Sequence, residues 1–217
     1  MNYEILFEDD ELLIVYKPAN LATQTAKVGE EDLCSLLSKY RVEKGEDPFI
    51  GVITRLDQPV EGVVAFGKTS RATDELSKQL RERKITKKYY CIITSERLPE
   101  KGTLTDYLVK DTVGSKAKVV NENYPRAKRA ELQYRTLKRD SEGALLEVTL
   151  ITGRFHQIRV QLASRMAPIL GDVKYGGKSN GKPLALCAYD MSLLHPLSKE
   201  PIHITINPKG EEFSHYL

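Results

Sequence analysis

A carboxylate, Asp57, and a guanidinium, Arg55, lie in the segment Thr54–Gly62 between two apolar runs, residues 49–53 and 63–66. Pro59 and Gly62 interrupt the segment, as expected of a loop at the edge of a sheet. A carboxylate beside a guanidinium stays ionised near neutral pH, and an ionised carboxylate shielded from bulk water acts as a nucleophile or base. Taken alone, an Arg-Leu-Asp triplet such as residues 55–57 more often marks a surface turn in which the Asp side chain forms a hydrogen bond with its own backbone.

Two further candidates lie later in the chain. Tyr89 begins a run of β-forming residues, and Arg159 follows a predicted strand at 144–151. Each has an ordinary alternative, because a strand tyrosine usually packs within a sheet and a helix arginine usually faces solvent. For His156 we favour a structural hydrogen bond at the start of a helix over work as a general base.

Other chemistries find little support in the sequence. A Ser–His–Asp order, a P-loop and a G-x-G-x-x-G segment are absent. Cys34, Cys91 and Cys187 lie far apart among apolar neighbours, so we interpret them as small core residues rather than a disulfide framework. The four histidines lack metal-ligand spacing, and we expect no metal.

The composition is that of a soluble globular protein. The chain has 217 residues, of which 41% are hydrophobic and 29% are charged. The sequence opens Met1-Asn2-Tyr3-Glu4 without a basic-then-apolar leader, and its apolar runs are shorter than the ~18 residues of a membrane span. We therefore expect a cytoplasmic protein with no membrane partner and, since no exposed apolar stripe stands out, a monomer.

Charge is distributed unevenly. Residues 1–50 carry 11 acidic and 5 basic side chains, a net charge of −6, which leaves +9 for the rest of a chain whose net charge is +3. Lys68–Lys88 has 8 basic and 3 acidic residues, and Lys110–Arg129 has 6 and 2. Such runs are usually solvated faces, but two of them near a candidate site suit a polyanion such as nucleic acid.

Hydrophobic periodicity predicts the elements that position these residues. Residues 3–7 and 12–16 predict a hairpin, residues 32–43 an amphipathic helix, and residues 70–83 a second helix capped by Thr69 or Ser70. Residues 95–130 are polar and predict irregular connections with short strands, whereas two long strands meet at residues 140–143.

The remaining residues predict a junction, a turn and two closing strands. Gly153 is expected to allow a sharp turn before a helix that begins near Phe155, with Arg159 off its core-facing stripe. A glycine-rich turn follows at 171–177, and residues 184–188 and 202–206 predict the closing strands. We predict a single α+β domain over residues 1–217, with a mixed, largely antiparallel sheet flanked by helices.

In this order, the motifs resemble those of the RluA-type pseudouridine synthases over nearly the whole chain. Arg55-Leu56-Asp57 with Gly62 resembles the catalytic motif, Lys87-Lys88-Tyr89 the Lys-x-Tyr strand, and Gly153–Arg159 the third motif. Further similarities are Lys17-Pro18, Gly171-Asp172 with Tyr175-Gly176, and His195-Pro196. The chain departs from the family pattern at Thr54 (usually His), Val60-Glu61 (usually Thr-Ser) and Phe155 (usually Thr).

The resemblance implies isomerisation of uridine to pseudouridine in RNA without a cofactor, and a pseudouridine-synthase-like catalytic domain without the auxiliary N-terminal RNA-binding domain of some members. Asp57 would be the essential carboxylate, acting on the sugar or on the base, Arg159 would pair with it, and Tyr89 would stack on the uracil. Ile158 would pack against the base and Arg55 would enter the space that a flipped nucleotide leaves. The remaining RNA-binding candidates at the third motif are Arg154, His156 and Gln157.

Ribosomal RNA is the first expectation for the substrate and transfer RNA the second. One alternative is a catalytically idle RNA-binding module with the same fold. Another is a glycoside-processing enzyme that uses Asp57 with Glu61 as its second carboxylate.

Overall fold

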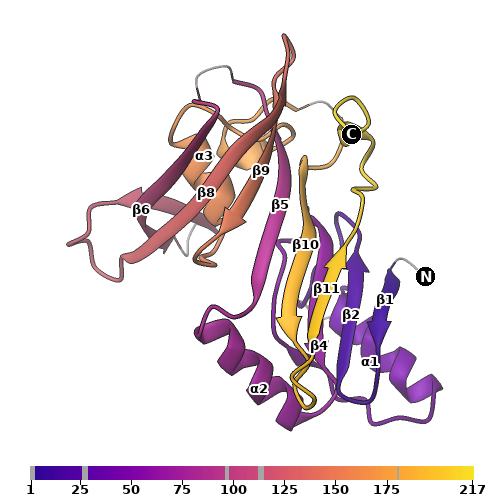
Figure 1. Ribbon diagram of the computed structural model, residues 1–217. Coiled ribbons are helices and arrows are strands. Elements are labelled where there is room, and N and C mark those ends of the chain that lie inside the picture. Colours follow the sequence, from indigo (N-terminus) through magenta and orange to yellow (C-terminus); the bar gives the residue numbers. More distant parts are fainter. Residues whose placement is uncertain (1–2, 26–28, 96–97, 112–114, 180) are drawn as a thin grey trace. The chain divides into compact units, whose positions relative to one another are not determined.

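A computed structural model describes residues 3–25, 29–95, 98–111, 115–179 and 181–217 (Figure 1). The expectation that the chain has no leader falls partly on Met1 and Asn2, which lie outside the described residues. Residues 112–114 of the second basic segment also lie outside them. The chain divides into two compact units. The first unit comprises Met1–Lys87 and Ala188–Pro208, and the second comprises Lys88–Cys187 and Lys209–Leu217. The α+β class is as predicted.

The first unit is a sheet with two helices. The expected hairpin forms as β1 (Glu4–Glu8) and β2 (Leu12–Lys17), and β2 pairs in antiparallel fashion with β4 (Glu61–Gly67). In the sheet, β10 neighbours β4. The other elements are β3 (Gly51–Val52), β10 (Leu186–Leu194, in this unit from Ala188), β11 (Pro201–Thr205), α1 (Leu33–Glu43) and α2 (Ser70–Arg81).

Both helices begin at a capping side chain. The Asp32 carboxylate accepts the Ser35 N–H at 2.8 Å and caps α1, and Thr69 Oγ1 accepts the Ala72 N–H at 3.1 Å and caps α2. Each cap satisfies a backbone donor that the first helical turn leaves without a partner. The helix boundaries therefore lie within two residues of those expected from the sequence.

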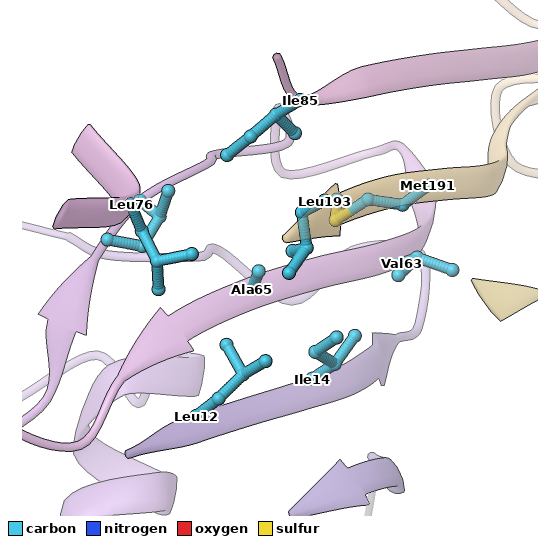
Figure 2. Packing of buried hydrophobic residues seen from close by; sticks show 9 residues of the cluster. Leu12, Ile14, Val63, Ala65, Leu76, Ile85, Met191 and Leu193 are labelled. Carbon is cyan, nitrogen blue, oxygen red and sulfur yellow. The ribbon is translucent and has the colours of Figure 1, made fainter. Parts of the chain in front are cut away.

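The core of the first unit lies between α2 and one face of the sheet. Leu12 and Ile14 of β2 meet Val63 and Ala65 of β4, because alternate strand residues share a face (Figure 2). Leu76 of α2 packs against them. The rest of this cluster is Ile53, Ile85, Met191 and Leu193.

The second unit is an antiparallel sheet in the order β5-β9-β8-β6-β7. A buried cluster joins Val160 of α3 to Leu108, Ala117 and Ala130 of β6, β7 and β8, so α3 covers one face of these strands. The elements are β5 (Thr86–Ile93, in this unit from Lys88), β6 (Lys101–Asp111), β7 (Lys116–Val120), β8 (Lys128–Arg139), β9 (Ala144–Leu150) and α3 (Gln157–Ala163).

The expectation of irregular connections with short strands over residues 95–130 is wrong for residues 101–111. β6 is an eleven-residue strand that pairs with both β7 and β8. Its buried apolar side chains, Leu104 and Leu108, share one face, whereas Thr103 and Thr105 on the other face are exposed. A strand with one solvated face and few apolar residues has a weak hydrophobic period. Polar composition was therefore mistaken for irregular structure.

One expectation about α3 is also wrong. The helix begins at Gln157, within two residues of the expected start, and the residue before it, His156, is left-handed at φ 51°. Arg159 is not on a solvent-facing side of the helix, since only 5% of its surface is exposed.

Candidate active site

Asp57 lies on the loop of residues 53–60, which joins β3 to β4 in the first unit. Its side chain is half-buried and Arg55 is exposed, whereas Leu56 between them is buried. The Asp57 carbonyl accepts the Val60 N–H at 3.0 Å, which closes a tight turn through Gln58. The loop therefore alternates buried and accessible side chains, with the carboxylate on the accessible side.

Buried hydroxyl groups fix this loop. Thr23 Oγ1 accepts the Leu56 N–H at 3.1 Å and donates to the Leu56 carbonyl at 3.0 Å. Thr54, at the position where the family usually has His, is buried, and its Oγ1 accepts the Ala65 N–H at 3.2 Å. The part of the loop that precedes Asp57 is thus held by the segment after β2 and by β4.

Lys17 provides a third support from beneath the loop. It is fully buried, and its Nζ donates to the carbonyls of Pro18 (2.8 Å), Leu21 (2.6 Å) and Gln58 (3.2 Å). Burial lowers the pKa of Lys17 to about 7, against the opposing influence of the Asp57 and Glu61 carboxylates. A lysine and two carboxylates thus interact electrostatically within this unit.

Glu61 has a structural partner. It is almost completely buried, and its Oε2 accepts a hydrogen bond from the Tyr16 hydroxyl. A glycosidase needs its second carboxylate beside the scissile bond, where it reaches substrate and water. The burial of Glu61 therefore argues against the glycosidase alternative.

The second unit contains the other candidate side chains. Tyr89 is buried on β5, opposite Val148 of β9. Arg159 of α3 forms a bidentate ion pair with Asp172, with Nε–Oδ2 and Nη2–Oδ1 distances of 2.8 Å. Both side chains are buried, and the Arg159 guanidinium also lies 5.2 Å from the centre of the Tyr175 ring.

Asp172 was not among the predicted site residues. Its place in the turn between two glycines, Gly171 and Gly176, both with positive φ, is a signal that sequence analysis can detect. The bidentate pair leaves the planar guanidinium of Arg159 with a fixed orientation. The expected pairing of Arg159 with Asp57 stays a prediction.

Gln157 organises the junction before α3. Its Oε1 accepts the Arg154 N–H at 2.9 Å and the Thr152 hydroxyl at 2.8 Å, and its Nε2 donates to the Glu131 carbonyl at 3.0 Å. The buried amide therefore shapes the turn that leaves Arg154 exposed. Contact of Gln157 or of the buried Ile158 with RNA stays a prediction.

His156 forms a hydrogen bond where α3 begins. Its Nδ1 lies 2.8 Å from the Tyr175 hydroxyl, whose oxygen accepts the Ala117 N–H at 2.6 Å. Burial, followed by the nearby charge of Arg159, lowers the pKa of His156 to about 3. A neutral imidazole whose Nδ1 accepts a hydrogen bond from the Tyr175 hydroxyl fits these contacts, in agreement with the structural role that we favoured.

Comparison with known proteins identifies the family of this chain. Residues 11–164 match the family described as RNA pseudouridylate synthase. The chain belongs to this family.

Curated relatives place the chain among the RluA-type members. It is 32% identical over 203 residues to an uncharacterized RNA pseudouridine synthase, YhcT, of Bacillus subtilis, and covers 66% of that protein with 92% of its own length. It is 31% identical over 206 residues to ribosomal large subunit pseudouridine synthase D of Nitrosomonas europaea, with 90% of this chain and 59% of that protein covered. The chain therefore spans less than two thirds of the length of these relatives.

A solved human structure, RNA pseudouridylate synthase domain containing 4, has a TM-score of 0.77 and 26% identity over 98% of this chain and 90% of that one. A second, domain containing 1, has a TM-score of 0.75 and 17% identity over 95% of this chain and 84% of that one, which supports the fold.

Two further findings concern the described part of the chain. Its helices are all too short or too polar to cross a membrane. Within the same residues, His, Cys, Asp and Glu side chains do not form a group of three suited to a metal ion.

Proposed function

We propose that this protein isomerises specific uridines in structured RNA to pseudouridine, with Asp57 as the essential carboxylate. The observation that carries the proposal is the family match, which spans Asp57, Tyr89 and Arg159 together. The reaction breaks the bond between ribose and the base nitrogen, rotates the base and forms a carbon–carbon bond, so no redox partner or group donor is needed.

Three supports around Asp57 suit this role. The loop is tied by Thr23, Thr54 and Lys17, so the carboxylate does not have to be ordered when the substrate binds. A base stacked in a helix is unreachable, and its extrusion costs on the order of a few kcal/mol. Stacking on Tyr89 and entry of the exposed Arg55 into the vacated space would offset this cost.

Ribosomal RNA is the substrate that we favour over transfer RNA. Relatives at 30–31% identity carry the names ribosomal large subunit pseudouridine synthase C and D. We further propose action in the cytoplasm, as a monomer and without a metal. Pseudouridine mapping across total cellular RNA, with and without the gene, would identify the substrate, and a lost position in transfer RNA would redirect the proposal.

The activity test uses Asp57→Asn. This substitution removes the charge and keeps the size, so the variant should fold, bind RNA and form no pseudouridine. Asp74→Asn, at an exposed position on α2, is the matched control and should remain active. Pseudouridine formed on an unmodified ribosomal RNA transcript is the readout.

Two outcomes would contradict the proposal. Clear turnover by Asp57→Asn would show that this carboxylate is not essential. RNA binding by the wild type without any product, on ribosomal and transfer RNA alike, would favour an idle RNA-binding module.

A further inference from the structure

Phe155 presents an aromatic ring at the surface of the second unit. Its exposed fraction is 37%, large for a phenylalanine, and it occupies the position where RluA-type enzymes usually have Thr. An isolated exposed apolar residue needs no explanation. The surroundings of Phe155 are what set it apart.

The ring of Phe155 has a rigid aromatic support. It stacks on the buried His156 ring, with centroids 3.8 Å apart and an interplanar angle of 21°. His156 is in turn held by the hydrogen bond from Tyr175, whose ring meets the imidazole edge-on at 5.6 Å. Since His156 stays neutral above its lowered pKa, the support carries no charge at physiological pH.

Cationic side chains lie close to the stacked pair of Phe155 and His156. Lys110 places its ammonium 4.7 Å from the Phe155 ring centre, and Lys174 lies close enough to His156 to affect the pKa of the imidazole. Arg154 is exposed and is anchored by an Nε bond to the Arg129 carbonyl at 2.9 Å. Nearby carboxylates have basic partners, since Asp111 pairs with Lys118 and Glu131 with Arg129, each at 2.7 Å.

We propose that Phe155 is a stacking platform for an unpaired base of the RNA substrate, with Lys110, Arg154 and Lys174 contacting the adjoining phosphates. An aromatic ring with cations around it matches the two features of an RNA strand, a flat base and a charged backbone. The inference rests on the proposed function and adds a binding subsite to it.

Energetics favour the base over the lysine at this ring. A cation–π contact at an exposed site contributes less binding free energy than the stacking of a base on an aromatic side chain. A base can therefore displace the flexible Lys110 ammonium, which moves to a phosphate.

A tryptophan substitution tests the stack directly, because the chain contains no tryptophan. Phe155→Trp introduces a single tryptophan at the platform, which can be excited selectively over the 11 tyrosines of the chain, and Phe49→Trp places one at an exposed phenylalanine of the first unit. On titration with single-stranded oligouridine, the indole fluorescence of the Phe155→Trp variant should be quenched and that of the Phe49→Trp variant should not. A duplex of the same length, whose bases are already stacked, should quench the Phe155→Trp variant less.

Affinity gives the second readout. Phe155→Leu keeps an apolar side chain but removes the π face, and it should weaken oligouridine binding about 5-fold or more, whereas Phe49→Leu should not. Unquenched fluorescence in a Phe155→Trp variant that binds oligouridine, or equal affinity of Phe155→Leu and wild type, would overturn the platform.

Failure of the platform is distinguishable from failure of the activity. Pseudouridine formation by the wild type, together with unquenched fluorescence of the Phe155→Trp variant, rejects the platform alone. A wild type that neither binds RNA nor forms pseudouridine rejects the proposed function and the platform with it.

Discussion

At the residue scale, the position of Asp57 depends on a lysine that is removed from water. Lys17 is fully buried, and one of its three carbonyl partners, Gln58, belongs to the turn that follows Asp57. Burial lowers its pKa to about 7, so a charged ammonium at this place is costly. The carboxylates of Asp57 and Glu61 favour the charged form, and three donated hydrogen bonds require it.

His156 makes stability depend on pH on the acid side. In the unfolded chain it takes up a proton below about pH 6.5, whereas in the folded protein its pKa is about 3. The unfolded state therefore binds more protons between these values, and the free energy of unfolding falls as the pH is lowered through this window. His156 alone changes the free energy of unfolding by at most ~1.4 kcal/mol per pH unit.

The test compares urea denaturation of His156→Gln and wild type at pH 6.5, 5.5 and 4.5. The variant lacks this contribution, so the difference in unfolding free energy between the two proteins should shrink as the pH falls. Parallel curves for His156→Gln and wild type would show that His156 is not held neutral.

At the element scale, Gly62 allows β4 and β10 to lie close together. Its φ is +128°, and a Cβ built there would lie 2.3 Å from the Ala188 carbonyl oxygen and 2.6 Å from the Ala188 nitrogen. Both atoms belong to the backbone and cannot rotate away. Any side chain at residue 62 must therefore push β10 from β4, just beyond the Asp57 loop.

We predict that Gly62→Ala lowers the free energy of unfolding by about 3 kcal/mol, since overpacking adds to left-handed strain. Gly45→Ala is the control. Gly45 also has positive φ, at +75°, but meets open space, so it should cost only about 1 kcal/mol. Thermal or urea denaturation measures both, and equal losses would mean that the close approach to Ala188 is unimportant.

The sequence predicted most elements that have a strong apolar period or a cap. The β1–β2 hairpin, both capped helices and the β8–β9 hairpin follow from local residue patterns. β6 did not, because only one of its faces is buried, and the left-handed His156 did not, because a local pattern assigns positive φ to glycine first. The motifs predict Asp57, Tyr89 and Arg159 as site residues, but the burial of Arg159 against Asp172 arises from a tertiary contact that no local period encodes.

At the scale of the whole molecule, recognition of RNA should be dominated by charge. The excess of basic residues outside the first 50 residues suits a polyanion, and neutralised phosphates release counterions on binding. Raising the salt concentration should therefore weaken binding of ribosomal RNA fragments by about ten-fold or more between 50 and 200 mM. Filter binding at several salt concentrations measures the slope, and affinity independent of salt would argue against an RNA partner.

The order of the chain through the two units also bears on how the protein is made. The first unit needs Ala188–Pro208, and Met191 and Leu193 complete the apolar cluster that contains Leu12 and Ile14. During synthesis the N-terminal strands therefore have an incomplete apolar cluster until residues 88–187 have been synthesised and the segment Ala188–Pro208 follows. The second unit, by contrast, lacks only Lys209–Leu217 when residue 187 has emerged. In the growing chain, the second unit can therefore begin to fold before the first unit is complete. Until Ala188–Pro208 has emerged, the apolar face of β2 and β4 is the surface that a nascent-chain chaperone would have to protect.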